Sequence, residues 1–150
     1  MIKKIRHTGI VVNNIDLMLI FYKQLGFSIS KRLYEKGDYI DQIVNIRKVN
    51  LETVKLQLSD KDMIELLKYH NHPHPKKIFK RKNDSNEYGW SHVAFTVDSI
   101  QETINTITEN GGSVLNSPSE PPNGNVKVAY CHDPEGNIIE LVEETKYKLT

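Results

Sequence analysis

Two histidines and two glutamates could together form one metal-binding centre in this chain. The imidazoles belong to His7 and His92, and the carboxylates belong to Glu65 and Glu140. Such a mixed nitrogen and oxygen donor set suits Zn²⁺, Ni²⁺, Co²⁺, Mn²⁺ or Fe²⁺ better than soft Cu⁺, which prefers sulfur. Four protein ligands would leave room on an octahedral ion for a substrate that offers two neighbouring oxygens.

The two histidines reveal an internal repeat. The segment His7–Ile15 matches His92–Ile100 in residue type, and the same offset in numbering places Gly26 on Gly111. Repeats of this kind indicate a duplicated structural unit. Short apolar strings often match by chance, but histidines and glycines at matched places rarely do. We therefore expect a duplicated module.

The two glutamates continue the repeat at a shorter offset. The string MIELL around Glu65 matches the string IIELV around Glu140. The two glutamates are 75 positions apart, whereas the two histidines are 85 positions apart. The first copy must therefore contain ten extra residues between about positions 30 and 62. Apolar residues recur at helical intervals in residues 38–47, which predicts a short inserted helix there.

Each copy has the pattern of a βαβββ module. Strands with period-two alternation are predicted over residues 5–12, 27–33, 51–58, 63–69, 90–97, 113–116, 126–131 and 137–142, and the strand over 51–58 should have one apolar face. Between the first two strands of each copy lies a helix, capped by Asn13 or Asn14 in the first copy and by Asp98 or Ser99 in the second. The first helix is predicted over residues 15–25, where Leu17, Met18, Phe21, Tyr22 and Leu25 recur at helical spacing.

The fold class expected is α+β, with two βαβββ modules forming a curved mixed β-sheet that has a concave metal-binding face. Residues 1–70 form the first module, residues 71–89 a linker and residues 90–150 the second module, which together make one compact domain. In each copy the histidine lies near the start of the first strand and the glutamate lies in the last. Two copies related by a pseudo-twofold axis would then supply all four side chains to one ion.

Each of these residues also has a plainer interpretation. A single histidine in a strand is more often a hydrogen-bonded structural residue, and a glutamate in an IEL string more often faces solvent. However, an ionised carboxylate on a mostly apolar strand face is costly unless it is paired or bound to metal. The occurrence of matched pairs in both copies favours the metal site.

The end of the first module and the linker offer a rival group of histidines. His70, His72 and His74 alternate and could chelate a metal, but the prolines between them interrupt regular structure. The basic residues of 76–82 could hold a phosphate. For both the histidines and the basic residues, we favour exposure to solvent over a binding site.

Composition narrows the class of protein. The chain has 150 residues, a formal net charge of +1 and a single cysteine, Cys131. The charge balance argues against general nucleic-acid binding, and one cysteine excludes an internal disulfide framework. No apolar run reaches the roughly 18 residues of a membrane span, and the first residues resemble a strand rather than a signal peptide. We expect a cytoplasmic protein with a small-molecule substrate and no nucleic-acid or membrane partner.

The segments HTGIVV, GWSHVAFTVDSI and HDPEGNIIELVE and the two-copy layout resemble the vicinal oxygen chelate superfamily over about residues 4–145. This superfamily includes glyoxalase I, methylmalonyl-CoA epimerase, extradiol dioxygenases and bleomycin-binding proteins. Its metal ligands lie in the first and last strands of each module, which correspond here to the four residues named above. The His/Glu/His/Glu set resembles bacterial glyoxalase I, whereas the segment YIDQIVNI (39–46) resembles a pocket-side helix of other glyoxalase-like members.

The resemblance implies a metal-dependent lyase or isomerase that forms a homodimer. Proton transfer would pass through a metal-bound enediolate on a vicinal-oxygen substrate such as a hemithioacetal. Glu140 is favoured as the catalytic base, with Glu65 as the alternative. A non-catalytic drug-binding protein, a methylmalonyl-CoA epimerase and an extradiol dioxygenase remain alternatives. Dioxygenases usually bind their iron through two histidines and one carboxylate, so the additional carboxylate of Glu65 counts against the dioxygenase alternative.

Overall fold

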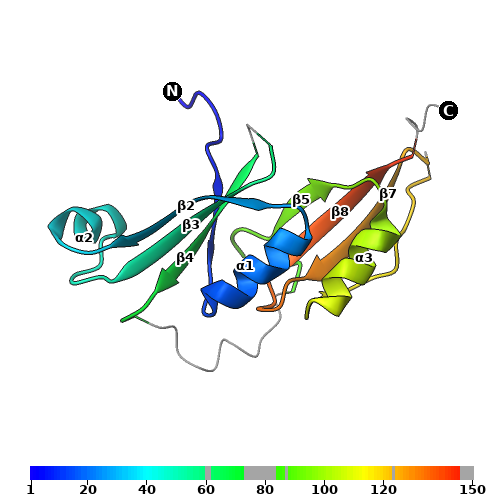
Figure 1. Cartoon of the computed structure of the whole chain (residues 1–150). Coiled ribbons are helices and arrows are strands. Elements are labelled where there is room, and N and C mark those ends of the chain that lie inside the picture. Colours follow the sequence, from blue (N-terminus) through cyan, green and yellow to red (C-terminus); the bar gives the residue numbers. More distant parts are fainter. Residues whose placement is uncertain (60–61, 73–83, 87, 123, 146–150) are drawn as a thin grey trace. The chain divides into compact units, whose positions relative to one another are not determined.

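The computed structural model describes residues 1–59, 62–72, 84–86, 88–122 and 124–145. The chain divides into two compact units, Met1–Phe79 and Lys80–Thr150. Each unit contains its own four-stranded mixed sheet (Figure 1). The predicted α+β class with two modules is therefore confirmed, with one sheet in each module.

The two units have the same strand order. The N-terminal unit consists of β1 (Thr8–Val11), α1 (Ile15–Gln24), β2 (Ser28–Glu35), α2 (Asp38–Val44), β3 (Leu51–Gln57) and β4 (Met63–Tyr69). The C-terminal unit consists of β5 (His92–Thr96), α3 (Ile100–Glu109), β6 (Ser113–Val114), β7 (Val126–His132) and β8 (Ile138–Glu144). The sheet orders are β1-β4-β3-β2 and β5-β8-β7-β6, and the first strand of each unit pairs in parallel with the last.

The internal repeat holds at the level of single residues. Helices α1 and α3 start at Ile15 and Ile100, which are equivalent positions in the repeat because they have the same spacing as the two histidines. Strands β4 and β8 start at Met63 and Ile138, which the repeat of the two glutamates places on each other. The ten extra residues of the first copy include α2, which confirms the predicted inserted helix.

The first helix of each unit begins at a polar cap. The side chain of Asn14 accepts a hydrogen bond from the Leu17 amide, and Ser99 accepts one from the Glu102 amide. These caps satisfy amide groups that have no partner within the helix. Of the helically spaced apolar residues of α1, Met18, Phe21 and Tyr22 are buried, whereas Leu17 is 40% exposed and shares its side of the helix with the exposed Ile20.

Helix α2 packs against the same sheet face that carries Glu65. Its Ile40 forms a buried cluster with Val49 and Leu51, and Leu67 and Tyr69 of β4 pack against this cluster. Leu67 and Tyr69 alternate with Glu65 along β4, so all three point to one face. The predicted apolar face of β3 carries the fully buried Val54 and Leu56. The first residues of β3 are also covered on the other face, so that the polar Glu52 and Thr53 are both buried, whereas Lys55 and Gln57 are partly exposed.

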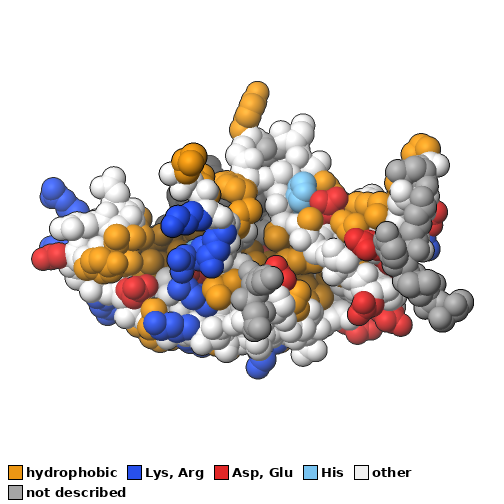
Figure 2. Space-filling view, turned by 90° about the horizontal axis from the view of Figure 1, so that it is seen from above, with side chains coloured by type: hydrophobic (Ala, Val, Ile, Leu, Met, Phe, Trp, Pro, Cys, Tyr) orange, Lys and Arg blue, Asp and Glu red, His pale blue; other side chains and the backbone are white. Residues whose placement is uncertain are grey.

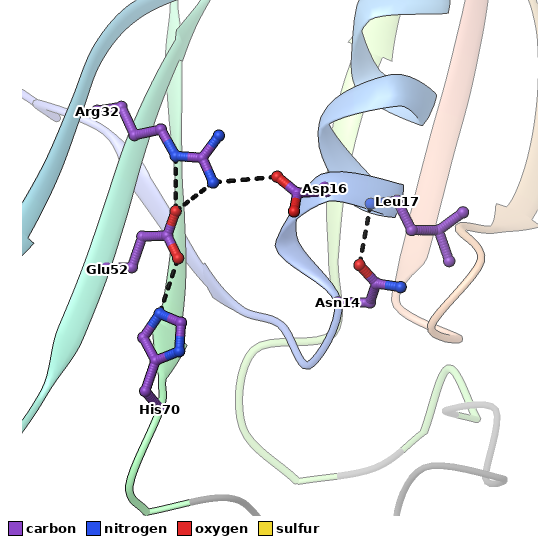
Figure 3. Close-up of polar contacts among 6 residues, drawn as sticks. All are labelled: Asn14, Asp16, Leu17, Arg32, Glu52 and His70. Atoms are coloured by element: carbon purple, nitrogen blue, oxygen red, sulfur yellow. Dashed lines mark hydrogen bonds and ion pairs between the residues drawn. The ribbon is translucent and has the colours of Figure 1, made fainter.

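An ion-pair network around the buried Glu52 ties elements of the N-terminal unit together (Figure 3). Glu52 is only 2% exposed and accepts hydrogen bonds from Arg32 Nε at 2.6 Å and from His70 Nε2 at 2.8 Å. The guanidinium of Arg32 also donates to Asp16 in the first turn of α1, at 3.0 Å. The network therefore joins α1, β2, β3 and the residue that follows β4.

The network also determines the protonation of Glu52. Burial raises the pKa of its carboxyl, but hydrogen bonds from Tyr34, His70 and Arg32 together lower the pKa below the ordinary value of 4.5. A carboxyl with a lowered pKa stabilises the folded state at higher pH. That stabilisation is lost as the pH falls through the folded-state pKa.

No helix in the described part of the chain is long and apolar enough to cross a membrane. The single cysteine, Cys131, is buried, and burial raises the pKa of its thiol to about 11. A thiol with this pKa is a poor metal ligand at neutral pH, since the thiolate is the ligating form.

We expect Glu52→Gln to lower the free energy of unfolding by about 1–3 kcal/mol at pH 7, because Arg32 and His70 lose their charged partner. The difference from the wild-type protein should shrink as the pH falls through the lowered folded-state pKa of Glu52, because the carboxyl then becomes protonated. Urea unfolding at a series of pH values measures both effects. The exposed Asp38→Asn variant is the control, and a pH-independent difference would contradict the assignment.

Candidate metal centre

The N-terminal unit brings His7 and Glu65 together. His7 immediately precedes β1, and Glu65 lies in β4, which pairs in parallel with β1. His7 Nε2 is 3.2 Å from Glu65 Oε2, and the side chains are 28% and 13% exposed. Parallel pairing of the two strands therefore places an imidazole and a carboxylate close enough to share one ligand.

The C-terminal unit repeats this arrangement with His92 and Glu140. His92 begins β5, and Glu140 lies in β8, its parallel neighbour. His92 Nε2 is 2.9 Å from Glu140 Oε2, with the side chains 29% and 21% exposed. Both pairs are partly covered but open to solvent, as expected for groups that could bind a ligand.

Strand parity places each glutamate on the sheet face opposite to its buried neighbours. Ile139 and Leu141, which flank Glu140, are buried, and Glu143 on their side accepts a hydrogen bond from the first amide of α3, at Ile100. Since α3 lies on that face, Glu140 points to the opposite one. In β4 the residues on either side of Glu65 are buried in the same way.

The side chains beside the two glutamates differ. Lys55 lies opposite Glu65 in the sheet, and its Nζ is 3.9 Å from Glu65 Oε1. Tyr130 lies opposite Glu140, and its ring centroid is 5.1 Å from that of His92. Burial raises the pKa of the Tyr130 phenol, and the charge of Glu140 raises it further. One carboxylate thus lies beside a cation and the other beside a neutral phenol.

The donor chemistry fits a divalent metal. Imidazole nitrogens and carboxylate oxygens are ordinary ligands for Zn²⁺ and similar first-row ions. His7 Nδ1 is buried without a hydrogen-bond partner, so that ring has a polar atom not otherwise used. Each unit brings together two of the four predicted residues. No group of three or more His, Cys, Asp or Glu side chains arranged to hold a metal is found among the described residues.

The histidines of the predicted linker do not form a site in the described residues. His70 binds Glu52, and His72 Nδ1 is 3.1 Å from the side-chain oxygen of Asn71. His74 and the basic residues of 76–82 lie outside the described residues. Sequence reasoning missed the His70–Glu52 contact. The available signal was Glu52 itself, a carboxylate that alternates with apolar residues along a buried strand.

Fold and site define a two-module α+β protein with one His/Glu pair in each module. The sequence profile of the Glyoxalase/Bleomycin resistance protein/Dioxygenase superfamily matches residues 4–141. The chain belongs to this superfamily, which confirms the resemblance seen in the sequence.

Curated relatives agree with this assignment, and a solved structure shares the fold. A Synechocystis protein named "Probable lactoylglutathione lyase" is 30% identical over 144 residues, which cover 95% of this chain and 96% of that protein. A Vibrio cholerae protein of the same name is 40% identical over 58 residues, which cover 39% of this chain and 41% of that protein. A crystal structure of a glyoxalase family protein from Bacillus cereus has a TM-score of 0.87 at 23% identity, covers 96% of this chain and 95% of that one, and shows the same fold.

The contact between Glu140 and Tyr130 can be tested by titration. Because the charge of Glu140 opposes formation of the phenolate, we expect Glu140→Gln to lower the pKa of Tyr130. The difference in phenolate absorbance between each protein and its Tyr130→Phe counterpart isolates this phenol. Glu109→Gln, an exposed change in α3, should leave the pKa unchanged. An unchanged pKa in Glu140→Gln would mean that the two side chains do not interact.

Proposed function

We propose that the protein is a divalent-metal-dependent lyase of the glyoxalase I type that acts on the hemithioacetal of an α-oxoaldehyde and a thiol. The observation that carries this proposal is the His/Glu pair that each module forms at the same register of its parallel strands. Membership of the superfamily and the relatives named lactoylglutathione lyase support it.

We assign His7, Glu65, His92 and Glu140 as the metal ligands, one imidazole and one carboxylate from each module. Zn²⁺, Ni²⁺, Co²⁺, Mn²⁺ and Fe²⁺ all suit this donor set. When bound, such an ion acts as a Lewis acid that makes the carbon-bound proton next to a carbonyl more acidic. The two histidines and Glu65 would hold the ion, and Glu140 would combine metal binding with proton transfer.

We assign Glu140 as the catalytic base. Its role would be to take the proton from one carbon of the hemithioacetal and return it to the adjacent carbon, which isomerises the substrate without an external oxidant. The asymmetry of the two pairs supports this choice. Lys55 partly compensates the charge of Glu65, whereas in the described part of the chain Glu140 pairs with His92 alone.

Replacing the carboxylates by amides tests this assignment. We expect Glu140→Gln to lower kcat by about 10²–10⁴-fold, the usual effect of losing a general base. Glu65→Gln should lose less turnover and more metal affinity, since Glu65 serves as a ligand only. Disappearance of the hemithioacetal of methylglyoxal measures the rates, and Glu109→Gln is the matched control. Full turnover in Glu140→Gln would rule out this carboxylate as the base.

Metal dependence is a separate test. Chelator-treated protein should be inactive and should recover activity with at least one of the five ions. His7→Ala and His92→Ala should each weaken metal binding by at least about tenfold, because each removes one ligand. Elemental analysis and metal titration measure this. Unchanged metal binding in both variants, or purified protein that neither contains nor needs metal, would favour the non-catalytic drug-binding alternative.

Three expectations from the sequence remain predictions. These are the homodimer, the cytoplasmic location and the exclusion of nucleic-acid and membrane partners. Assays with methylmalonyl-CoA and with catechols under the same metal conditions separate the epimerase and dioxygenase alternatives from the lyase.

A further inference from the structure

The duplication places a hydrogen-bond donor opposite each candidate carboxylate. In the N-terminal sheet Lys55 lies opposite Glu65, and in the C-terminal sheet Tyr130 lies opposite Glu140. Lys55 and Tyr130 are equivalent positions in the repeat, because they are 75 positions apart, as the two glutamates are. The donor is an ammonium group in one module and a phenol in the other. The two positions therefore differ in the kind of donor but not in its place on the sheet.

The two donors also differ in what they contact. The Lys55 ammonium forms an ion pair with Glu65, with 3.9 Å between Nζ and Oε1. The Tyr130 ring lies beside the imidazole of His92, with 5.1 Å between the ring centroids. Among the residues that the structure describes, no hydrogen bond involves the Tyr130 hydroxyl. The folded C-terminal unit therefore leaves this donor available to a ligand.

The backbone holds Tyr130 in a fixed place. Strand β7 pairs with β8 on one side. On the other side, the Tyr130 amide donates to Asn116 Oδ1 and the Tyr130 carbonyl accepts from the Leu115 amide, both at 2.8 Å. Ala129 and Cys131, the neighbours of Tyr130, are fully buried, so alternation along the strand directs Tyr130 to the opposite face, which also carries the candidate base. A donor held in this way needs little reorganisation when a ligand binds.

The length of the side chain determines what the phenol can contact. A tyrosine side chain is longer than those of histidine and glutamate, and Tyr130 is only partly buried. The side chains of His92 and Glu140 are themselves 29% and 21% exposed. Figure 2 shows a histidine and acidic side chains at the surface of the face that it draws. The hydroxyl can therefore reach a small molecule that lies over the His92/Glu140 pair.

We propose that Tyr130 is a further catalytic residue, whose hydroxyl donates a hydrogen bond to the substrate oxygen that becomes negative when Glu140 removes the carbon-bound proton. This inference rests on the proposed function and adds a residue to it. A hydrogen bond to an oxygen that gains charge is stronger in the transition state than in the bound substrate, so it lowers the barrier.

The phenol acts without losing its own proton. When Glu140 takes the proton from carbon, the electron pair of the broken C–H bond moves through the adjacent carbon onto the carbonyl oxygen, which accepts the hydrogen bond from Tyr130. Glu140 then returns the proton to the former carbonyl carbon. The hydroxyl proton of the hemithioacetal passes to the charged oxygen, and a new carbonyl forms beside the thiol. Tyr130 stays protonated throughout, as expected of a phenol at neutral pH.

A binding test uses an unreactive mimic of the charged substrate. Acetohydroxamate offers two neighbouring oxygens and carries a negative charge when it binds a metal. We expect Tyr130→Phe, which removes only the hydroxyl, to weaken binding of acetohydroxamate to the metal-loaded protein about tenfold, the usual effect of losing a hydrogen bond to a charged group. Imidazole, a metal ligand without oxygen, should bind both proteins equally. Calorimetric titration measures the dissociation constants.

A matched variant and a stability measurement are the controls. Tyr88→Phe makes the same change at a fully exposed phenol and should bind acetohydroxamate as the wild-type protein does. Urea unfolding should show that Tyr130→Phe keeps the stability of the wild-type protein. Equal affinity of Tyr130→Phe and the wild-type protein for acetohydroxamate, or an equal loss of affinity for acetohydroxamate and imidazole, would overturn the inference.

Kinetics separate this inference from the proposed function. With the hemithioacetal of methylglyoxal, Tyr130→Phe should lower kcat about 10–100-fold with little change in KM, because the hydrogen bond strengthens in the transition state. Full kcat in this variant would overturn the role of Tyr130 and leave the lyase assignment standing. If the wild-type protein shows no turnover while the hydroxyl-dependent binding of acetohydroxamate persists, the lyase assignment fails and Tyr130 remains a donor to a bound oxyanion. A protein that binds none of the five ions would overturn both.

Discussion

The parallel pairing of the first strand with the last strand in each module is the constraint on which the candidate site depends. Parallel neighbours cannot be joined by a tight turn, and between them the chain passes through two other strands and either two helices, in the first unit, or one, in the second. That path separates His7 widely from Glu65 in sequence and still brings Nε2 and Oε2 to within 3.2 Å. Because the same register recurs in β5 and β8, the second pair forms by the same geometry.

The surroundings of each pair follow from alternation along the strands. Residues next to the glutamates, such as Leu66 and Leu141, are fully buried and fix the orientation of β4 and β8. A slip of one residue would bury the carboxylates and expose the leucines, which is unfavourable on both counts. The hydrophobic pattern therefore maintains the direction of the candidate site residues Glu65 and Glu140.

Much of this arrangement could be predicted from the sequence, because the repeat doubled every signal. A helix cap such as Asn14 or Ser99 and a glycine such as Gly26 or Gly111 are weak signals alone and reliable when they recur at one offset. Contacts that occur in only one copy could not be predicted in this way. The repeat does not predict the ion pairs of Glu52, because the residue at the equivalent position of the second copy is a lysine. Periodicity also could not show that α2 covers part of the sheet face that carries Glu65.

The duplication also explains why the two modules were free to diverge. One His/Glu pair supplies two ligands, fewer than the three or four protein ligands of catalytic and structural zinc sites. If the proposed centre forms, neither module could lose its pair without losing the metal, whereas the side chains beside the pairs carry no such constraint. Lys55 beside Glu65 and Tyr130 beside Glu140 are the result: equivalent backbone positions with a cation in one copy and a neutral aromatic ring in the other. Glu65 and Glu140 thereby lie in two different electrostatic environments, and such differences are how two equivalent carboxyl groups can take different roles in acid–base chemistry.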